Sequence, residues 1–309
     1  AGGEFKVYGG SDQSQWGQMA NASLIMSGGI LDFVDKAIAI QDYAPYAFTS
    51  TITGGVIRTQ MGFIAQSPGF NPDGGTVYIY GEQNSMIVSE NGSTFYNLTT
   101  NNPNYFTRAR ILTSTIKNNF IIEEGLVEIT IGWEIECWNN LEIQDGGMLS
   151  IGSGTLKMKN LASINVYQNG TLMTSGYNAA YSKICAISPT DCYTLTFHSG
   201  SLVDANYTIF ENLPEQGIYF ASGSLAGQTN TFKNCIFRNG KSGPNTLITL
   251  DNEQDLVIEN ASFPTNTWGG QYNVRKTVNA GSVTFVNSTG DFSGEAFDDD
   301  PYNRIHWIT

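Results

Sequence analysis

The segment FIIEEGLVEI, residues 120–129, places apolar side chains in alternation on both sides of a polar pair and Gly125. The glycines of this and four later copies follow one another at steps of 22, 23, 30 and 23 residues. The later copies are LEIQDGGMLSI (141–151), INVYQNGTLM (164–173), LTFHSGSLV (195–203) and IYFASGSL (218–225). A repeat of this length indicates a solenoid, and the apolar period of two within each copy predicts strands.

A second series of repeats places Phe210, Phe237 and Phe263 at steps of 27 and 26 residues, and we expect these rings to stack in one internal row. Weaker copies before residue 118 and after residue 277 extend the repeat over most of the chain. The step of 30 residues predicts a loop insertion near 176–193. Helical periodicity is nearly absent, and its one candidate is a short capping element at residues 30–40.

Coils of about 22–27 residues fit two or three short strands with turns, which is the geometry of a parallel β-helix. A leucine-rich repeat would need its Leu-x-x-Leu-x-Leu frame, and a propeller blade would need a longer repeat. Glycine and asparagine at the turns supply left-handed backbone conformations, and repeated asparagines can stack as an amide ladder. The sequence therefore predicts an all-β, single elongated domain of about 11–13 coils, roughly 50–65 Å long at the spacing of stacked strands.

Several segments carry a resemblance to a known group of proteins. They are the three phenylalanine coils, the Ser-Gly-Ser turns, GSTFYNLT (92–99) and the closing GEAFDDDPYNRIHW (294–307). They resemble right-handed parallel β-helix repeats of secreted bacterial cell-surface and adhesin proteins, the non-catalytic members of the pectate-lyase-like superfold. The resemblance covers residues 75–309, so we expect β-helix repeats over 76–309 and N-terminal coils or a capping or assembly segment over 1–75. It implies an extracellular, cell-surface location.

The composition excludes several classes of function. The formal net charge is −13 and the pI is near 4.5, which argues against nucleic acid or an anionic membrane surface as partner. Only 14% of the residues are charged, too few for a coiled coil. No apolar run is long enough for a membrane-spanning helix, so no membrane insertion is expected. The chain begins at Ala1 without a secretory signal, as a processed mature protein would.

The four cysteines bear on the cellular compartment. Cys185 and Cys192 bracket a short loop, and in a secreted protein they are predicted to form a disulfide. Cys137 and Cys235 lie among apolar residues and fit either buried thiols or a bridge. With two histidines and no Cys-x-x-Cys motif, a zinc site is not expected.

The residues that catalysis would need are missing from the pattern. Hydrolases of this fold use clustered carboxylates and a Gly-His-Gly motif, whereas the only aspartate run here is 298–300, and neither His198 nor His306 lies between glycines. Lyases need a calcium-binding aspartate group beside a basic residue. The basic residues are few, with same-face pairs at 108/110 and 157/159. We therefore predict that the chain is not an enzyme.

An acidic–aromatic patch is the best candidate for ligand binding. The alternation over residues 127–138 points Glu128, Glu134, Glu136 and Trp138 outward, and Glu142 follows on the next strand. Carboxylates on adjacent coils would lie about 5 Å apart and could hold Ca²⁺, or Trp138 could stack on a sugar ring. The alternative is a solvated surface, with the nearby Trp133 in the core.

The two ends of the chain are candidates for assembly. Unpaired edge strands invite pairing with another chain. The apolar residues that would make the contact are Phe5, Val7 and Tyr8 at one end and Ile305, Trp307 and Ile308 at the other. Donation of the strand around Phe5 to a neighbour would build a head-to-tail filament, and the alternative is that this strand pairs within its own chain.

The function that the sequence favours is that of a non-catalytic extracellular structural or adhesive protein, with end-to-end assembly into a surface filament as one form of it. The alternative is a carbohydrate-binding or polysaccharide-degrading β-helix protein. The expected partners are copies of the chain itself or surface glycans. Calcium is the one ion that the acidic–aromatic patch would suit.

Overall fold

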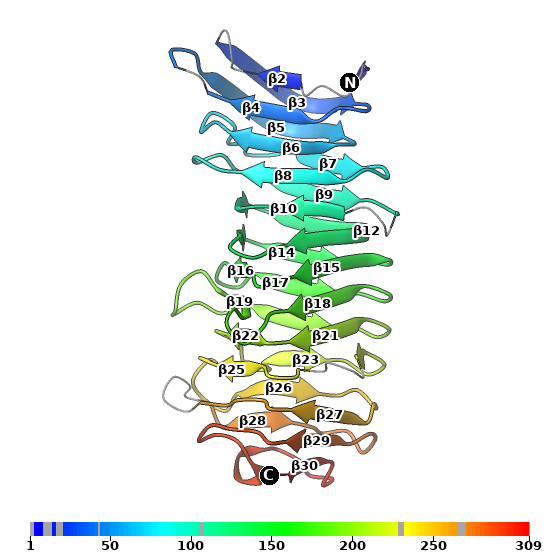
Figure 1. Cartoon of the computed structure of the whole chain (residues 1–309), viewed down its shortest axis with the longest axis vertical. Helices are drawn as coiled ribbons and strands as arrows, with labels where there is room; N and C mark the ends of the chain where they lie inside the picture. Colours follow the sequence, from blue (N-terminus) through cyan, green and yellow to red (C-terminus); the bar gives the residue numbers. More distant parts are fainter. Residues whose placement is uncertain are drawn as a thin grey trace.

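The computed structural model describes residues 3–8, 14–16, 21–42, 44–104, 108–227, 232–264 and 270–308. Parallel strands stack along one long axis, from the N-terminal strands at the top of Figure 1 to β30 at the bottom. They form a single-domain β-solenoid of about 12 turns, which confirms the predicted all-β fold and the number of coils. The right-handed sense stays a prediction. None of the described residues forms a helix that is long and apolar enough to cross a membrane.

Each full turn carries strands on up to three faces. Face A contains β1 (Glu4–Val7), β3 (Ala22–Phe33), β5 (Phe48–Thr59), β7 (Thr76–Tyr80), β9 (Asn97–Asn101), the first half of β12 (Asn119–Ile129), β14 (Asn140–Ile143), β17 (Ser163–Val166), β20 (Thr194–Phe197), β23 (Ile218–Phe220), β26 (Thr246–Leu250) and β28 (Tyr272–Arg275). Face B contains β2 (Ser14–Trp16), β4 (Ile38–Gln41), β6 (Gly62–Gln66), β8 (Ser85–Ser89), β10 (Arg108–Ile111), the second half of β12, β15 (Gly147–Ile151), β18 (Thr171–Ser175), β21 (Leu202–Asn206) and β24 (Leu225–Ala226).

Face C is a narrower sheet that closes the coils of the central and C-terminal parts. It contains β11 (Ser114–Ile116), β13 (Glu134–Cys137), β16 (Thr155–Met158), β19 (Ser182–Ala186), β22 (Thr208–Glu211) and β25 (Ile236–Arg238). The last coils carry a separate sheet of β27 (Leu256–Glu259), β29 (Val283–Val286) and β30 (Ile305–Ile308). The short 3-10 helix η1 (Glu295–Phe297) lies against β28 and β30.

Strand β12 shows how the sequence pattern produces the core. Phe120 and Ile122 are buried under face A, and Val127 and Ile129 are buried under face B, because the alternation restarts after the corner. Gly125 makes that corner with a φ of +81°, and a Cβ there would lie 1.6 Å from the carbonyl oxygen of residue 102 on the preceding coil. Only glycine fits such a close approach.

The predicted row of phenylalanines is confirmed. Phe210, Phe237 and Phe263 are fully buried, and their ring centroids lie 5.5 and 5.3 Å apart in near-parallel stacks. Trp307 continues the row, 5.8 Å from Phe263. The core of the C-terminal half is therefore held by one continuous aromatic column.

The predicted asparagine ladder is also present, at two corners of the solenoid. Between faces C and A, Asn139 donates to Asn118, and Asn118 donates to Asn97, both at 2.9 Å. Between faces B and C, a second ladder joins Asn260, Asn234 and Asn206 at 3.0 and 3.1 Å. The middle amide of each ladder, Asn118 or Asn234, thus both accepts and donates along the axis, which holds the turns of successive coils in register.

Three expectations about organisation can be compared with the structure. The predicted helical segment 30–40 is wrong, because Ile30–Phe33 pairs with β5 and Ile38–Gln41 pairs with β6 as strands. The predicted insertion consists of two loops, one before β19 and one after it. The face A ladder continues without interruption across residue 75, where β5 pairs with β7.

At the N-terminal end, β1 pairs with β3 of its own chain, with Phe5 opposite Leu31 and Val7 opposite Phe33. The structure therefore selects pairing within the chain over donation of this strand to a neighbour. Val7 packs against the core, whereas Phe5 and Tyr8 are 67% and 68% exposed.

At the C-terminal end, β30 pairs with β29 and supplies the last layer of the core. Ile305 is fully buried, and Trp307 stacks on Phe285 at 4.3 Å. Ile308 is 53% exposed. End-to-end assembly through these exposed residues stays a prediction.

Candidate binding groove

A groove of about 610 Å³ lies on the outside of the solenoid beside β8 and β10. This volume is typical of sites for small ligands. Its lining consists of Met61, Asn84, Ser85, Met86, Arg108, Arg110, Leu112, Thr130 and Trp133. We refer to it as the arginine groove.

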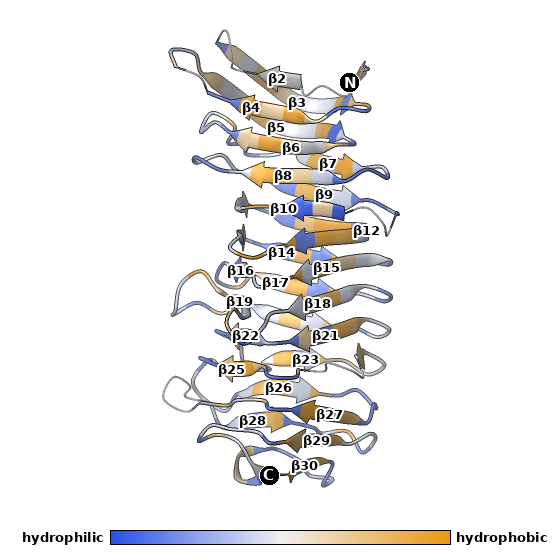
Figure 2. Cartoon of the chain, viewed as in Figure 1, coloured by the Kyte–Doolittle hydropathy of each residue, from blue (hydrophilic) through white to orange (hydrophobic). Residues whose placement is uncertain are grey.

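The sequence of β10, Arg-Ala-Arg-Ile, explains how two cations come to lie side by side. Ala109 and Ile111 are fully buried, so Arg108 and Arg110 both point outward, with side chains 44% and 56% exposed. Figure 2 shows a strongly blue, hydrophilic segment on β10. The alternation of the sequence had indicated this same-face pair.

One carboxylate forms ion pairs with both arginines. Glu128 lies on β12 directly opposite Arg110, and its two oxygens are 2.6 Å from Arg108 Nη1 and 3.7 Å from Arg110 Nε. Two guanidinium groups carry up to ten N–H donors, so most remain available to a ligand. The groove therefore bears a local positive charge on a chain whose net charge is −13.

Apolar side chains form the other walls of the groove. Trp133 is partly buried against the edge of the core and lines the groove from the turn before β13. Met86 on β8 is 42% exposed. The expectation that Trp133 belongs to the core is met only in part. The contribution of Met86 was not foreseen, because it depends on the register between β8 and β10.

The acidic–aromatic patch is distributed over three faces. Glu128 lies on face B, Glu134 and Glu136 lie on face C, and Glu142 lies on face A. The outward direction predicted for Glu134 and Glu136 is confirmed, since Ile135 and Cys137 between them are buried. The turn at residues 130–133 separates Glu128 from Glu134 on the solenoid.

The members of this patch have partners of their own. Lys157 Nζ lies 2.5 Å from Glu134, and Gln144 donates to Glu142 at 3.2 Å. Trp138 donates its indole N–H to Glu136 at 3.3 Å and carries Lys159 over its ring at 4.4 Å. Calcium takes six to eight oxygen ligands. Across the described ranges, no three His, Cys, Asp or Glu residues come together as a metal site would require.

The predicted disulfide between Cys185 and Cys192 is wrong, because all four cysteines are free thiols. Cys185 is buried on β19, opposite Lys157 of the preceding strand β16. Cys192 lies at the corner toward face A, where its N–H bonds to Asn160 Oδ1 at 3.3 Å and its carbonyl accepts from Leu161. The loop between the two thiols turns this corner, so closeness in sequence does not bring them together.

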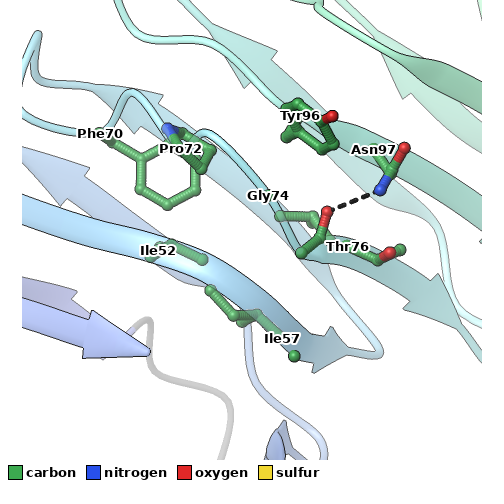
Figure 3. A pocket seen from close by; sticks show the side chains of 11 residues that line it. Ile52, Ile57, Phe70, Pro72, Gly74, Thr76, Tyr96 and Asn97 are labelled. Carbon is green, nitrogen blue, oxygen red and sulfur yellow. Dashed lines mark hydrogen bonds between the residues drawn. The ribbon is translucent and has the colours of Figure 1, made fainter. Parts of the chain in front are cut away.

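Two other hollows are poorer candidates. The cavity in Figure 3, between Ile52, Phe70 and Tyr96, holds about 10 Å³, which is room for one water at most. A groove of about 200 Å³ on face C contains Glu211. Burial raises the pKa of that carboxyl, but Lys183 and Arg238 outweigh it and bring the pKa below its usual value. Its charges are satisfied within the chain.

In the comparisons with known proteins, no family model, no curated protein and no solved structure matches this chain. A solenoid fold serves many functions, so the argument for function comes from the groove itself.

Proposed function

We propose that the chain is a non-catalytic, extracellular adhesive rod that binds an acidic glycan in the arginine groove. The observation that carries the proposal is the pair Arg108 and Arg110 on one strand, sharing the single carboxylate of Glu128 beside Trp133. A guanidinium binds a carboxylate through two parallel hydrogen bonds, which a uronic acid can accept. The indole of Trp133 offers an apolar surface to the C–H groups of a sugar ring.

The scaffold supports binding rather than catalysis. Glycoside hydrolysis needs two carboxyl groups on opposite sides of the scissile bond. In the groove, the carboxylate of Glu128 is engaged by two arginines. The arginines stand on a strand paired on both sides, so their positions are fixed before a ligand arrives. A rigid rod with a recessed cationic site suits the retention of an acidic polymer at a cell surface.

The test is a titration of the full chain with oligogalacturonate, with a neutral galactose oligomer as the comparison ligand. We expect Arg110→Ala to weaken oligogalacturonate binding by about 10-fold or more, since it removes charge-assisted hydrogen bonds of about 1.5–3 kcal/mol. Arg110→Lys keeps the charge but loses the paired geometry, so its affinity should be intermediate.

Lys159→Ala removes one exposed positive charge elsewhere and is the matched control. Its binding should equal that of the unaltered chain. Equal affinity of Arg110→Ala and the unaltered chain, or equal affinity for the acidic and neutral oligomers, would exclude the proposed function.

A further inference from the structure

A second aromatic site lies on face A, in the same coils as the arginine groove. On β7, Val77 and Ile79 are buried, so Tyr78 and Tyr80 both point outward. The centroids of the two tyrosine rings lie 6.1 Å apart, and their planes differ by 31°. Side by side and only moderately tilted, the rings form one aromatic surface.

The two hydroxyl groups are held at opposite ends of this surface. Tyr80 donates to Asp32 on β3, and Tyr78 donates to Glu123 on β12, each at 2.8 Å. The order of strands on face A is β3, β5, β7, β9, β12, so each bond reaches a strand two positions away, about 10 Å. A tyrosine and the carboxylate that accepts from it together span that distance, so both tyrosine side chains lean along the axis of the solenoid.

Arg58 and Asp32 lie against the tyrosine pair. Arg58 places its guanidinium carbon 4.5 Å from the centroid of the Tyr80 ring and 5.9 Å from that of the Tyr78 ring. The guanidinium also lies 3.8 Å from Asp32, which is only 2% exposed. Arg58 Nε is buried and has no hydrogen-bond partner. Arg58 therefore occupies one side of the tyrosine pair, and both tyrosines remain partly exposed to solvent.

The electrostatics of the surface favour a neutral ligand. Burial, and then hydrogen bonding to a carboxylate, raises the pKa of both tyrosines to about 12, so the rings are uncharged at ordinary pH. The carboxylates of Asp32 and Glu123 and the guanidinium of Arg58 together leave one net negative charge beside the surface, which does not favour an anion. Asn101, which donates to Glu123 at 2.9 Å, adds a polar rim that can bond to hydroxyl groups.

We propose that Tyr78 and Tyr80 form a platform, here called the tyrosine platform, on which a pyranose ring of a neutral glycan stacks through its C–H face. The negative face of an aromatic ring attracts the weakly positive C–H groups of a sugar, and the polar rim receives the hydroxyls. Fixed hydroxyl groups at both ends reduce the entropy lost on binding. The site is independent of the arginine groove, because it uses another face and takes a ligand without charge.

The test uses cellohexaose as the probe and measures its binding to the full chain by calorimetry. We expect Tyr78→Ala to lower the affinity about 10-fold or more, and Tyr78→Phe to lower it by no more than about 3-fold, because phenylalanine keeps the ring. Tyr272→Ala removes a tyrosine from β28 on the same face and is the matched control. Arg110→Ala should bind cellohexaose as the unaltered chain does, which separates this site from the proposed function.

Saturation-transfer NMR on the unaltered chain gives a second measurement that needs no variant. Irradiating the tyrosine ring protons should transfer saturation to the C–H protons of cellohexaose. Absence of this transfer, or unaltered affinity in a folded Tyr78→Ala chain, would overturn the proposal.

Discussion

Phe210 and Phe237 stack one coil apart, with their ring planes only 6° from parallel. Phe237 has a second stacked neighbour in Phe263, so it is enclosed on both sides along the axis. Truncating Phe237 to alanine should lower the free energy of unfolding by about 3–5 kcal/mol, through lost burial and the cavity left behind. Denaturant unfolding followed by circular dichroism measures this loss.

Leu225→Ala is the control for this prediction. Leu225 is 47% exposed, and its truncation should change stability by about 0.5 kcal/mol or less. If the two variants unfold at the same denaturant concentration, the aromatic column does not hold the C-terminal half.

The asparagine ladder predicts that the side-chain amide of Asn234 stabilises the fold, separately from the backbone conformation of this residue. Asn234 donates to Asn206, accepts from Asn260 and has a φ of +57°. Asn234→Gly keeps the backbone conformation and removes both bonds, so it should cost about 1–3 kcal/mol. Asn234→Ala should cost more than glycine, because alanine adds the strain of the left-handed conformation. Thermal melts of the two variants test this order, and a glycine variant as stable as the unaltered chain would contradict it.

The burial of Asp298 should make the stability of the folded chain depend on pH. Burial raises the pKa of Asp298 to about 6, against the bond from Trp307 and with the help of neighbouring carboxylates. The folded state binds the proton more tightly than the unfolded state, so an ionised Asp298 destabilises the folded chain. This destabilisation is complete above pH 6 and decreases as the pH falls toward 4.

Asp298→Asn removes that destabilisation. The variant should be more stable than the unaltered chain at pH 7, and the difference should shrink as the pH falls through 6. Melting curves of both proteins from pH 4 to pH 7 measure the difference, and a constant gap would show that Asp298 does not titrate in this range.

Thiol labelling tests the corrected state of the cysteines. Burial raises the pKa of the Cys185 thiol to about 11, which leaves it protonated and unreactive at neutral pH. Cys192, at the partly exposed corner, should react first with iodoacetamide, and Cys185 only after unfolding. After alkylation in denaturant without reductant, mass spectrometry should find all four cysteines modified. An unmodified pair would show that those two cysteines form a disulfide.

The fold could be predicted because its signal is local and repeated. The alternation around Gly125 and the spacing of Phe210, Phe237 and Phe263 each depend on residues within one coil, and stacking then follows for every copy. The helix predicted at residues 30–40 was wrong because a short apolar run fits both the helical period and the strand period when its strand partners are unknown.

The sites could not be predicted in the same way, because they depend on corners and on register between coils. Glu128 and Glu134 are six residues apart, yet a turn places them on different faces. The groove combines Met86, Arg110 and Trp133 from three segments, and the offsets between coils that align them vary. The false disulfide has the same origin.

The long hydrogen bonds of Tyr78 and Tyr80 have a mechanical consequence. In a solenoid each coil normally touches only its immediate neighbours, so the coils can peel away singly from an end. Tyr80 and Tyr78 instead fasten β7 to β3 on one side and to β12 on the other, past the coils in between. Separating any two adjacent strands between β3 and β12 on face A therefore also requires one of these two side-chain bonds to break.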